Sequence, residues 1–132
     1  MLKEIKLNTA QRNEMLDLTP QLNQFIKEIK AKSGLLSVYS PHTTSGITIN
    51  ENADPAVIYD LLHALDKLTP RLDDYRHAEG NSDAHLKSSL VGCSEQIIVE
   101  NGELMLGTWQ GVFFCEFDGP RSRRVWLKFI PA

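Results

Sequence analysis

The chain has 132 residues, of which 42% are hydrophobic and 23% charged, and its formal net charge is −3. This length suits one domain, residues 1–132, with a single core. The slight acidity argues against a dedicated nucleic-acid binder, and no apolar run approaches the roughly 18–20 residues that a membrane span needs. Cys93 and Cys115 form no CxxC motif, so we expect reduced thiols in a cytoplasmic protein rather than a disulfide framework.

The pattern of apolar residues predicts an α+β fold with mostly antiparallel β-sheets and two main helices. The first helix is expected to be capped by Thr19 and to end before Gly34. The second is expected to begin at Asp54, as its cap, and to stop at Pro70. Short strands are expected at residues 2–8, 14–18, 35–40, 46–50, 96–100, 103–106, 112–118 and 124–130.

Three further features refine this prediction. The second helix carries six apolar residues on one face, which should pack on the core, while His63 should lie on the opposite, exposed face. Asn101 and Gly102 give the strongest two-residue hairpin signal in the chain. Residues 70–94 are the least regular segment, and so long a loop inside a small domain is usually functional or disordered.

Three of the four histidines lie in polar segments punctuated by glycine. His42 follows a strand, whereas His77, Glu79 and His85 lie in an HxEGNxxxH sequence. If this sequence begins extended, His77 and Glu79 share a face, and the Gly-Asn pair could fold His85 back toward them. Three imidazoles brought together would suit zinc or a similar divalent ion. The alternative is three unrelated surface histidines, since the spacing matches no standard zinc motif.

Basic residues form a second set of candidates. Arg121, Arg123 and Arg124 follow the Asp-Gly-Pro turn, and guanidinium groups bind phosphates and carboxylates bidentately. A solvated basic turn, or ion pairs between subunits, would explain them equally well. Lys87 is a further candidate for contact with an anionic group.

Three other residues could take part in chemistry. Glu51 follows a strand and could be an acid–base group or a solvated loop carboxylate. Trp109 and Gln110 could stack on a planar heterocycle and donate hydrogen bonds to it, although a core or interface tryptophan is at least as common.

These motifs, taken in order, resemble the YjbQ-type family, which is also described as the secondary thiamine-phosphate synthases. The resemblance extends from about residue 2 to residue 130. One departure is Ile98, where a proline is common in the family. The motifs that carry the resemblance are His42-Thr43-Thr44, Asn50-Glu51, His77-x-Glu79-Gly80-Asn81, Ala84-His85-x-Lys87, Leu106-Gly107-x-Trp109-Gln110 and Asp118-Gly119-Pro120-Arg121.

The resemblance implies a homotrimer with its polar motifs in a cleft near the subunit boundaries. It also implies a divalent metal ion, zinc or magnesium-like, with His42, His77 and His85 as its ligands. The implied activity is a weak thiamine-phosphate synthase reaction, which couples an aminopyrimidine diphosphate to a thiazole phosphate and releases pyrophosphate.

For such a transferase, small phosphorylated metabolites are the expected partners, and the site residues divide into two groups. A metal-containing metabolite-binding protein and a metal-dependent hydrolase are the alternatives. The expected catalytic residues are Glu51, His77, Glu79 and Lys87, and the expected substrate-binding residues are Thr43, Thr44, Asn81, Trp109, Gln110, Arg121 and Arg124.

Overall fold

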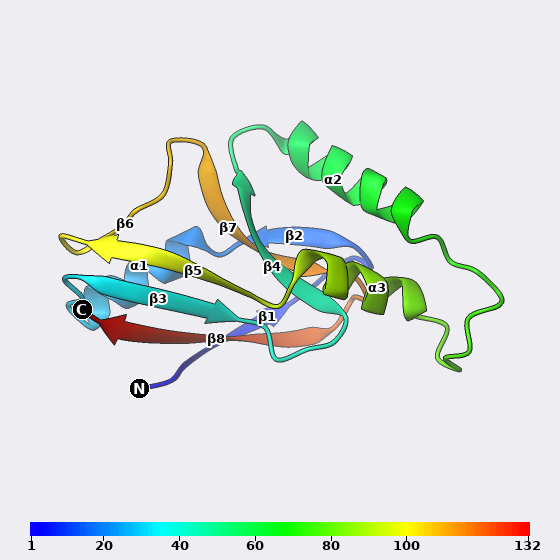
Figure 1. Ribbon diagram of the computed structural model, residues 1–132, viewed down its shortest axis with the longest axis horizontal. Helices are drawn as coiled ribbons and strands as arrows, with labels where there is room; N and C mark the ends of the chain where they lie inside the picture. The colour runs from blue at the N-terminus through cyan, green and yellow to red at the C-terminus, as the bar shows by residue number, and fades with distance from the viewer.

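The computed structural model describes residues 1–132, which form eight strands and three helices (Figure 1). All the strand pairs are antiparallel, as predicted. The elements in chain order are β1 (Lys3–Asn8), β2 (Glu14–Asp17), α1 (Thr19–Glu28), β3 (Gly34–Tyr39), β4 (Ser45–Glu51), α2 (Pro55–Leu68), α3 (Ser82–Val91), β5 (Ser94–Glu100), β6 (Glu103–Leu104), β7 (Gln110–Glu116) and β8 (Ser122–Pro131).

The strands form two sheets, and strands that follow one another in the sequence do not always belong to the same sheet. The larger sheet has the order β1-β8-β3-β5-β6, and the smaller has the order β2-β7-β4. β7 and β8 follow one another in the sequence but belong to different sheets, so the turn between them carries the chain from one sheet to the other. The side chains of this turn therefore lie where both sheets, and the residue that precedes α3, can contribute partners.

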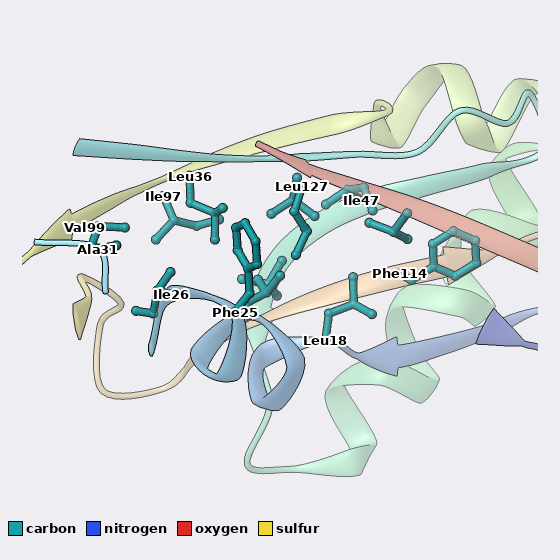
Figure 2. Close-up of a cluster of buried hydrophobic side chains, with 14 residues drawn as sticks. Leu18, Phe25, Ile26, Ala31, Leu36, Ile47, Ile97, Val99, Phe114 and Leu127 are labelled. Carbon is teal, nitrogen blue, oxygen red and sulfur yellow. The ribbon is translucent and has the colours of Figure 1, made fainter. Parts of the chain in front are cut away.

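The main core lies between α1 and the inner face of the larger sheet (Figure 2). Leu22, Phe25 and Ile26 give α1 its buried stripe, and Leu36 and Leu127 face them from β3 and β8. A smaller cluster, which consists of Ala84, Phe113, Cys115 and Phe117, lies under α3. β7 contributes to both clusters, and from its second residue onward every side chain of this strand is buried.

Several local predictions are confirmed. The Asp54 carboxylate accepts a hydrogen bond from Ala56 N at 2.9 Å and caps α2. Asn101 and Gly102 both have positive φ, at 52° and 76°, and they join β5 to β6 in the predicted hairpin. His63 is exposed on α2, as expected.

Other local predictions are wrong. α1 is preceded by Leu18 rather than by a Thr19 cap, and it ends at Glu28, so Gly34 opens β3 instead of ending a helix. The segment predicted to be irregular contains a third helix, α3, over its second half.

The expected packing of α2 is confirmed in part. Ile58, Leu62 and Leu65 pack against the smaller cluster, but none of the α2 side chains is fully buried, and Leu68, at the end of the helix, is 72% exposed. In Figure 1, α2 lies at the periphery of the molecule and leads through a long connection to α3. None of the three helices is long and apolar enough to cross a membrane.

Candidate functional site

The turn between β7 and β8 is built around a buried ion pair. Arg123 Nε donates to Glu116 Oε1 at 2.8 Å, and a second guanidinium nitrogen donates to the Thr44 hydroxyl at 2.8 Å. Thr9 donates its own hydroxyl to the same carboxylate at 2.7 Å. Burial alone would raise the Glu116 pKa, but these hydrogen bonds and the positive charge of Arg123 hold the pKa below its usual value. Arg123 and Thr44 thus serve the structure of the turn.

A second carboxylate of the same turn, Asp118, organises the residues around it. It accepts hydrogen bonds from Asn81 Nδ2 and from Arg121, each at 2.8 Å, and from Arg12 at 3.3 Å. Burial would raise the Asp118 pKa, but these donors and charges lower it overall. Arg121, a predicted phosphate ligand, therefore already has a carboxylate partner within the chain.

Asn81 is the residue of this arrangement whose hydrogen bonding is incomplete. Its side chain is buried, with 5% exposure, and its Oδ1 atom accepts no hydrogen bond. A buried carbonyl oxygen without a donor costs about 1–3 kcal/mol. Asn81 immediately precedes α3, so this unpaired acceptor lies at the start of the helix that carries His85.

Lys87 on α3 is the most deeply buried cation of the chain, at 1% exposure. Its ammonium group forms an ion pair with Asp66 of α2, donates to Asn13 at 3.2 Å and lies 3.7 Å from Asp83. An ammonium group has three donors, and three acceptors surround it here. Lys87 therefore links α2 to α3 in this structure, and its ammonium group is already engaged by internal partners.

His77 and His85 are the predicted ligands that the fold brings together. Their ring centroids lie 5.2 Å apart with the ring planes at 89°, and Glu79 Oε1 lies 4.0 Å from His77 Nε2. His85 is held on α3, whereas His77 and Glu79 lie on the connection before it. Beside them is a hollow of about 300 Å³, which is lined by Arg71, Leu72, Asp73, Tyr75, His77, Gly80 and Asp83.

His42 is not part of this group. It lines a different hollow, together with Arg124, and its Nε2 accepts a hydrogen bond from Arg124 N at 3.0 Å. In the side-chain conformations of this structure, no three His, Cys, Asp or Glu residues are close enough together to hold a metal ion, so His77 and His85 form a pair with the Glu79 carboxylate nearby rather than a finished ligand set. The ligand set that the resemblance implies is therefore not assembled within one chain.

Glu51, Trp109 and Gln110 lie together at the other end of the smaller sheet. Glu51 pairs with Gln110 across β4 and β7, whereas Ser45, at the start of β4, pairs with Glu116. A strand of this length spans about 20 Å, so these three residues are far from the Glu116 end. Trp109 is 63% exposed, and Gln110 Oε1 accepts the Gly107 N–H at 2.7 Å.

Most of the polar residues that support the site, some of them buried and some partly exposed, were not predicted from the sequence. Their polar character is evident in the sequence, but their partners lie up to 112 positions away in the chain, as in the hydrogen bond from Arg121 N to the Thr9 hydroxyl. Thr43, which was predicted to bind substrate, is exposed and makes no side-chain hydrogen bond. The missed residues are Thr9, Arg12, Asn13, Asp66, Asp83, Glu116 and Asp118.

Known proteins resemble this chain along nearly all of its length. The family model described as UPF0047 protein YjbQ-like matches residues 3–132. UPF0047 protein YugU of Bacillus subtilis is 53% identical over 98% of this chain and 99% of its own. A UPF0047 protein of Methanocaldococcus jannaschii is also 53% identical, over 98% of this chain and 94% of its own.

Solved structures show the same fold. A YjbQ/UPF0047 protein of Clostridium acetobutylicum has a TM-score of 0.95 at 52% identity, over 97% of this chain and 99% of its own. A protein of Aeropyrum pernix has a TM-score of 0.94 at 34% identity, over 100% and 99% of the two chains.

These comparisons correct the functional expectation. The relatives are described only as UPF0047 or YjbQ-like proteins, and none of the descriptions indicates thiamine-phosphate synthesis. The expectation of a thiamine-phosphate synthase is therefore wrong. The family assignment itself is confirmed: the chain belongs to the YjbQ-like UPF0047 family.

Proposed function

We propose that this protein binds a divalent metal ion through His77, His85 and Glu79, with coordination positions left open for a small ligand. The observation that carries the proposal is the perpendicular His77–His85 pair, with centroids 5.2 Å apart. Two imidazoles on a tetrahedral zinc ion, with Zn–N of about 2.0–2.1 Å, would place their centroids about 5 Å apart. The spacing found in the chain therefore suits a shared ion.

The donor set also fits such an ion. Two histidines and a glutamate form a common open zinc site, in which a fourth position remains free for water or substrate. The proposal requires the Glu79 carboxylate to move toward the histidine pair, because the three side chains do not form a ligand set as they stand; this side chain is 67% exposed and its Oε1 lies 4.0 Å from His77 Nε2. A bound divalent ion would supply a Lewis acid at this position. Asn81, with its unpaired Oδ1, offers a further acceptor nearby in the chain.

Metal titration tests this proposal. Calorimetry with Zn²⁺, and absorption spectra with Co²⁺, should show one ion per chain. Variants His77→Ala and His85→Ala should each lose at least tenfold in affinity, since each removes one ligand. His63→Ala is the matched control, because His63 is an exposed histidine that stacks on Tyr59 away from this site. Unchanged zinc affinity in both site variants would show that the assignment is wrong.

A variant of His42 separates this proposal from the ligand set that the resemblance implies. The Nε2 atom of His42 already accepts a hydrogen bond from the backbone, and the side chain lines another hollow. We therefore expect His42→Ala to keep its zinc affinity within twofold. A tenfold loss would mean that His42 of a second copy completes the site.

We further propose that the chain self-associates through α2. A helix normally buries its apolar stripe, but the stripe of α2 is only partly buried against the smaller cluster, and Leu68 at its end and Leu72 just after it are 72% and 49% exposed. A second copy of the chain would cover these residues; the expected number of three comes from the resemblance. The segment with His77 follows directly, so this contact would place the site near a subunit boundary.

Light scattering after size exclusion tests the contact. The wild type should exceed the mass of a 14.9 kDa monomer, and Leu68→Glu with Leu72→Glu should lower its mass. Ile98→Glu is the control, because Ile98 is 58% exposed on the larger sheet instead. An unchanged mass in the double variant, or a loss of assembly only in the control, would exclude this contact.

A further inference from the structure

A second hollow of the chain, of about 490 Å³, has the composition of an anion site. It lies along β1 and the start of β8 and shares no lining residue with the hollow beside His77. Seven of its eight lining residues are polar or charged. They are Glu4, Lys6, Asn8, His42, Ser122, Arg123 and Arg124, with Leu7 as the eighth.

Two cations of this hollow oppose each other across neighbouring strands. Lys6 of β1 pairs directly with Arg124 of β8 in the sheet register. Like charges at directly opposed positions destabilise a sheet. Neither side chain forms an ion pair with a carboxylate, although the other four cations around the β7–β8 turn and α3 all do. Arg124 instead lies over the Trp126 ring, at 5.6 Å from its centroid.

The one carboxylate of the hollow does not neutralise this pair. Glu4 accepts a hydrogen bond from Trp126 Nε1 at 3.0 Å and makes no ion pair with Lys6 or Arg124. Arg123, the third cation of the lining, is neutralised by Glu116. The excess positive charge therefore comes from Lys6 and Arg124 alone.

Two neutral donors of the same hollow are also unused. His42 Nε2 accepts the Arg124 N–H, so the neutral ring carries its proton on Nδ1, which has no partner in the chain. Asn8 accepts from the Ser122 hydroxyl through Oδ1, and its amide nitrogen donates to nothing. The hollow thus combines two unpaired cations with two unpaired N–H donors.

We infer that this hollow binds a small oxyanion, a phosphate or carboxylate group, between Lys6 and Arg124, with His42 and Asn8 as additional donors. A bound anion converts an unfavourable cross-strand pair into two charge-assisted contacts. This site is separate from the proposed metal site and does not depend on it. Of the residues that the sequence predicts to contact an anion, this site keeps Arg124 but not Arg121 and Lys87, which have internal carboxylate partners.

Calorimetry with inorganic phosphate, at an ionic strength held constant with chloride, tests the inference. The wild type should bind phosphate, and Lys6→Gln and Arg124→Gln should each weaken binding about tenfold or more, because each removes a charge-assisted contact. Lys128→Gln should stay within twofold of the wild type. It is the matched control, because Lys128 is an exposed cation on the same face of β8 outside this hollow.

Thermal unfolding distinguishes a binding role from a structural one. In chloride, the double variant K6Q/R124Q should unfold at the same temperature as the wild type or higher, because it relieves repulsion. In phosphate, only proteins that keep both Lys6 and Arg124 should unfold at a higher temperature than they do in chloride. A lower unfolding temperature in chloride would assign the two cations a structural role and overturn the inference.

Other results of these experiments would overturn the inference or assign the two cations another role. No phosphate binding by the wild type, or wild-type affinity in K6Q/R124Q, would overturn the inference. If His77→Ala and His85→Ala abolish phosphate binding while K6Q/R124Q retains it, the anion binds at the metal site instead. A drop in oligomeric mass in K6Q/R124Q, without phosphate binding by the wild type, would assign the cations to a subunit contact.

Discussion

Replacing Arg123 by methionine should destabilise the protein more than any other single loss of charge in the β7–β8 turn. Glu116 has 0% exposure and Arg123 has 6%. Arg123 supplies two of the four hydrogen bonds to that carboxylate; Thr9 and Asp118 N supply the others. Arg123→Met would leave the buried Glu116 charge with only the Thr9 and Asp118 N donors and no cation, a change that costs about 3–5 kcal/mol.

Urea denaturation at pH 7 measures this cost. Arg124→Met is the matched control: Arg124 is the next residue of β8, is exposed and has no ion-pair partner, so its loss should cost less than about 1 kcal/mol. The double variant Glu116→Gln/Arg123→Met should recover part of the loss, because it removes the unpaired charge. A loss below about 1 kcal/mol in Arg123→Met would refute the reasoning.

The pH dependence gives an independent check. In the wild type the Glu116 pKa lies below its ordinary value of 4.5, so its contribution to stability is present above pH 4.5 and is lost as the pH falls through the folded pKa. Without Arg123, burial should raise the Glu116 pKa above 4.5, so acidification should stabilise the variant. The difference in unfolding free energy should therefore narrow from pH 7 to pH 4. A constant difference would contradict this account.

Three further predictions concern other parts of the fold. Gly119→Ala would place a Cβ 2.1 Å from Gln11 O, so it should lower the free energy of unfolding by about 1–3 kcal/mol or more, as measured in urea. Cys93 should react with iodoacetamide at pH 8 while native Cys115 does not, because burial raises the Cys115 pKa to about 12; mass spectrometry should find one adduct in the native protein and two in the denatured one. Lys87→Met should cost about 1–3 kcal/mol, because it removes the cation shared by Asp66 and Asp83, although Asp83 keeps its ion pair with Arg12; an unchanged urea midpoint would contradict this.

The parts of the fold that the sequence predicted depend on local interactions. The Asp54 cap requires only a hydrogen bond to Ala56, two residues on, and the Asn101-Gly102 turn requires only two residues that tolerate positive φ. Such features can be predicted from the sequence because the residues that determine them are close together in the chain.

The sequence pattern did not predict α3, because this helix buries polar side chains and exposes apolar ones. Asp83, Lys87 and Ser88 are buried, whereas Leu86 and Leu90 are 42% and 63% exposed. A search for an apolar stripe therefore finds no helix face here. The buried side chains are polar because they meet carboxylates, amides and backbone carbonyls from distant parts of the chain, and those partners are known only after folding.

The three arginines after the β7–β8 turn show why the candidate site could be predicted only in part. Their sequence suggests one anion-binding cluster, but Arg123 is buried against Glu116, Arg121 pairs with Asp118, and only Arg124 has no carboxylate partner. Alternation along β8 separates buried Arg123 from its exposed neighbours, whereas the carboxylates that neutralise Arg123 and Arg121 come from β7 and from the turn after it.

A variant of His42 distinguishes the proposed anion site from the proposed metal site. The family resemblance implies that His42 binds a metal ion with His77 and His85. The structure instead places it beside Lys6 and Arg124, and its Nε2 atom already accepts a hydrogen bond from a backbone N–H. A histidine held in this way can still donate through Nδ1, which suits an anion better than a metal ion. His42→Ala should therefore weaken phosphate binding while zinc affinity stays constant, and the reverse result would join His42 to the metal site across a subunit boundary.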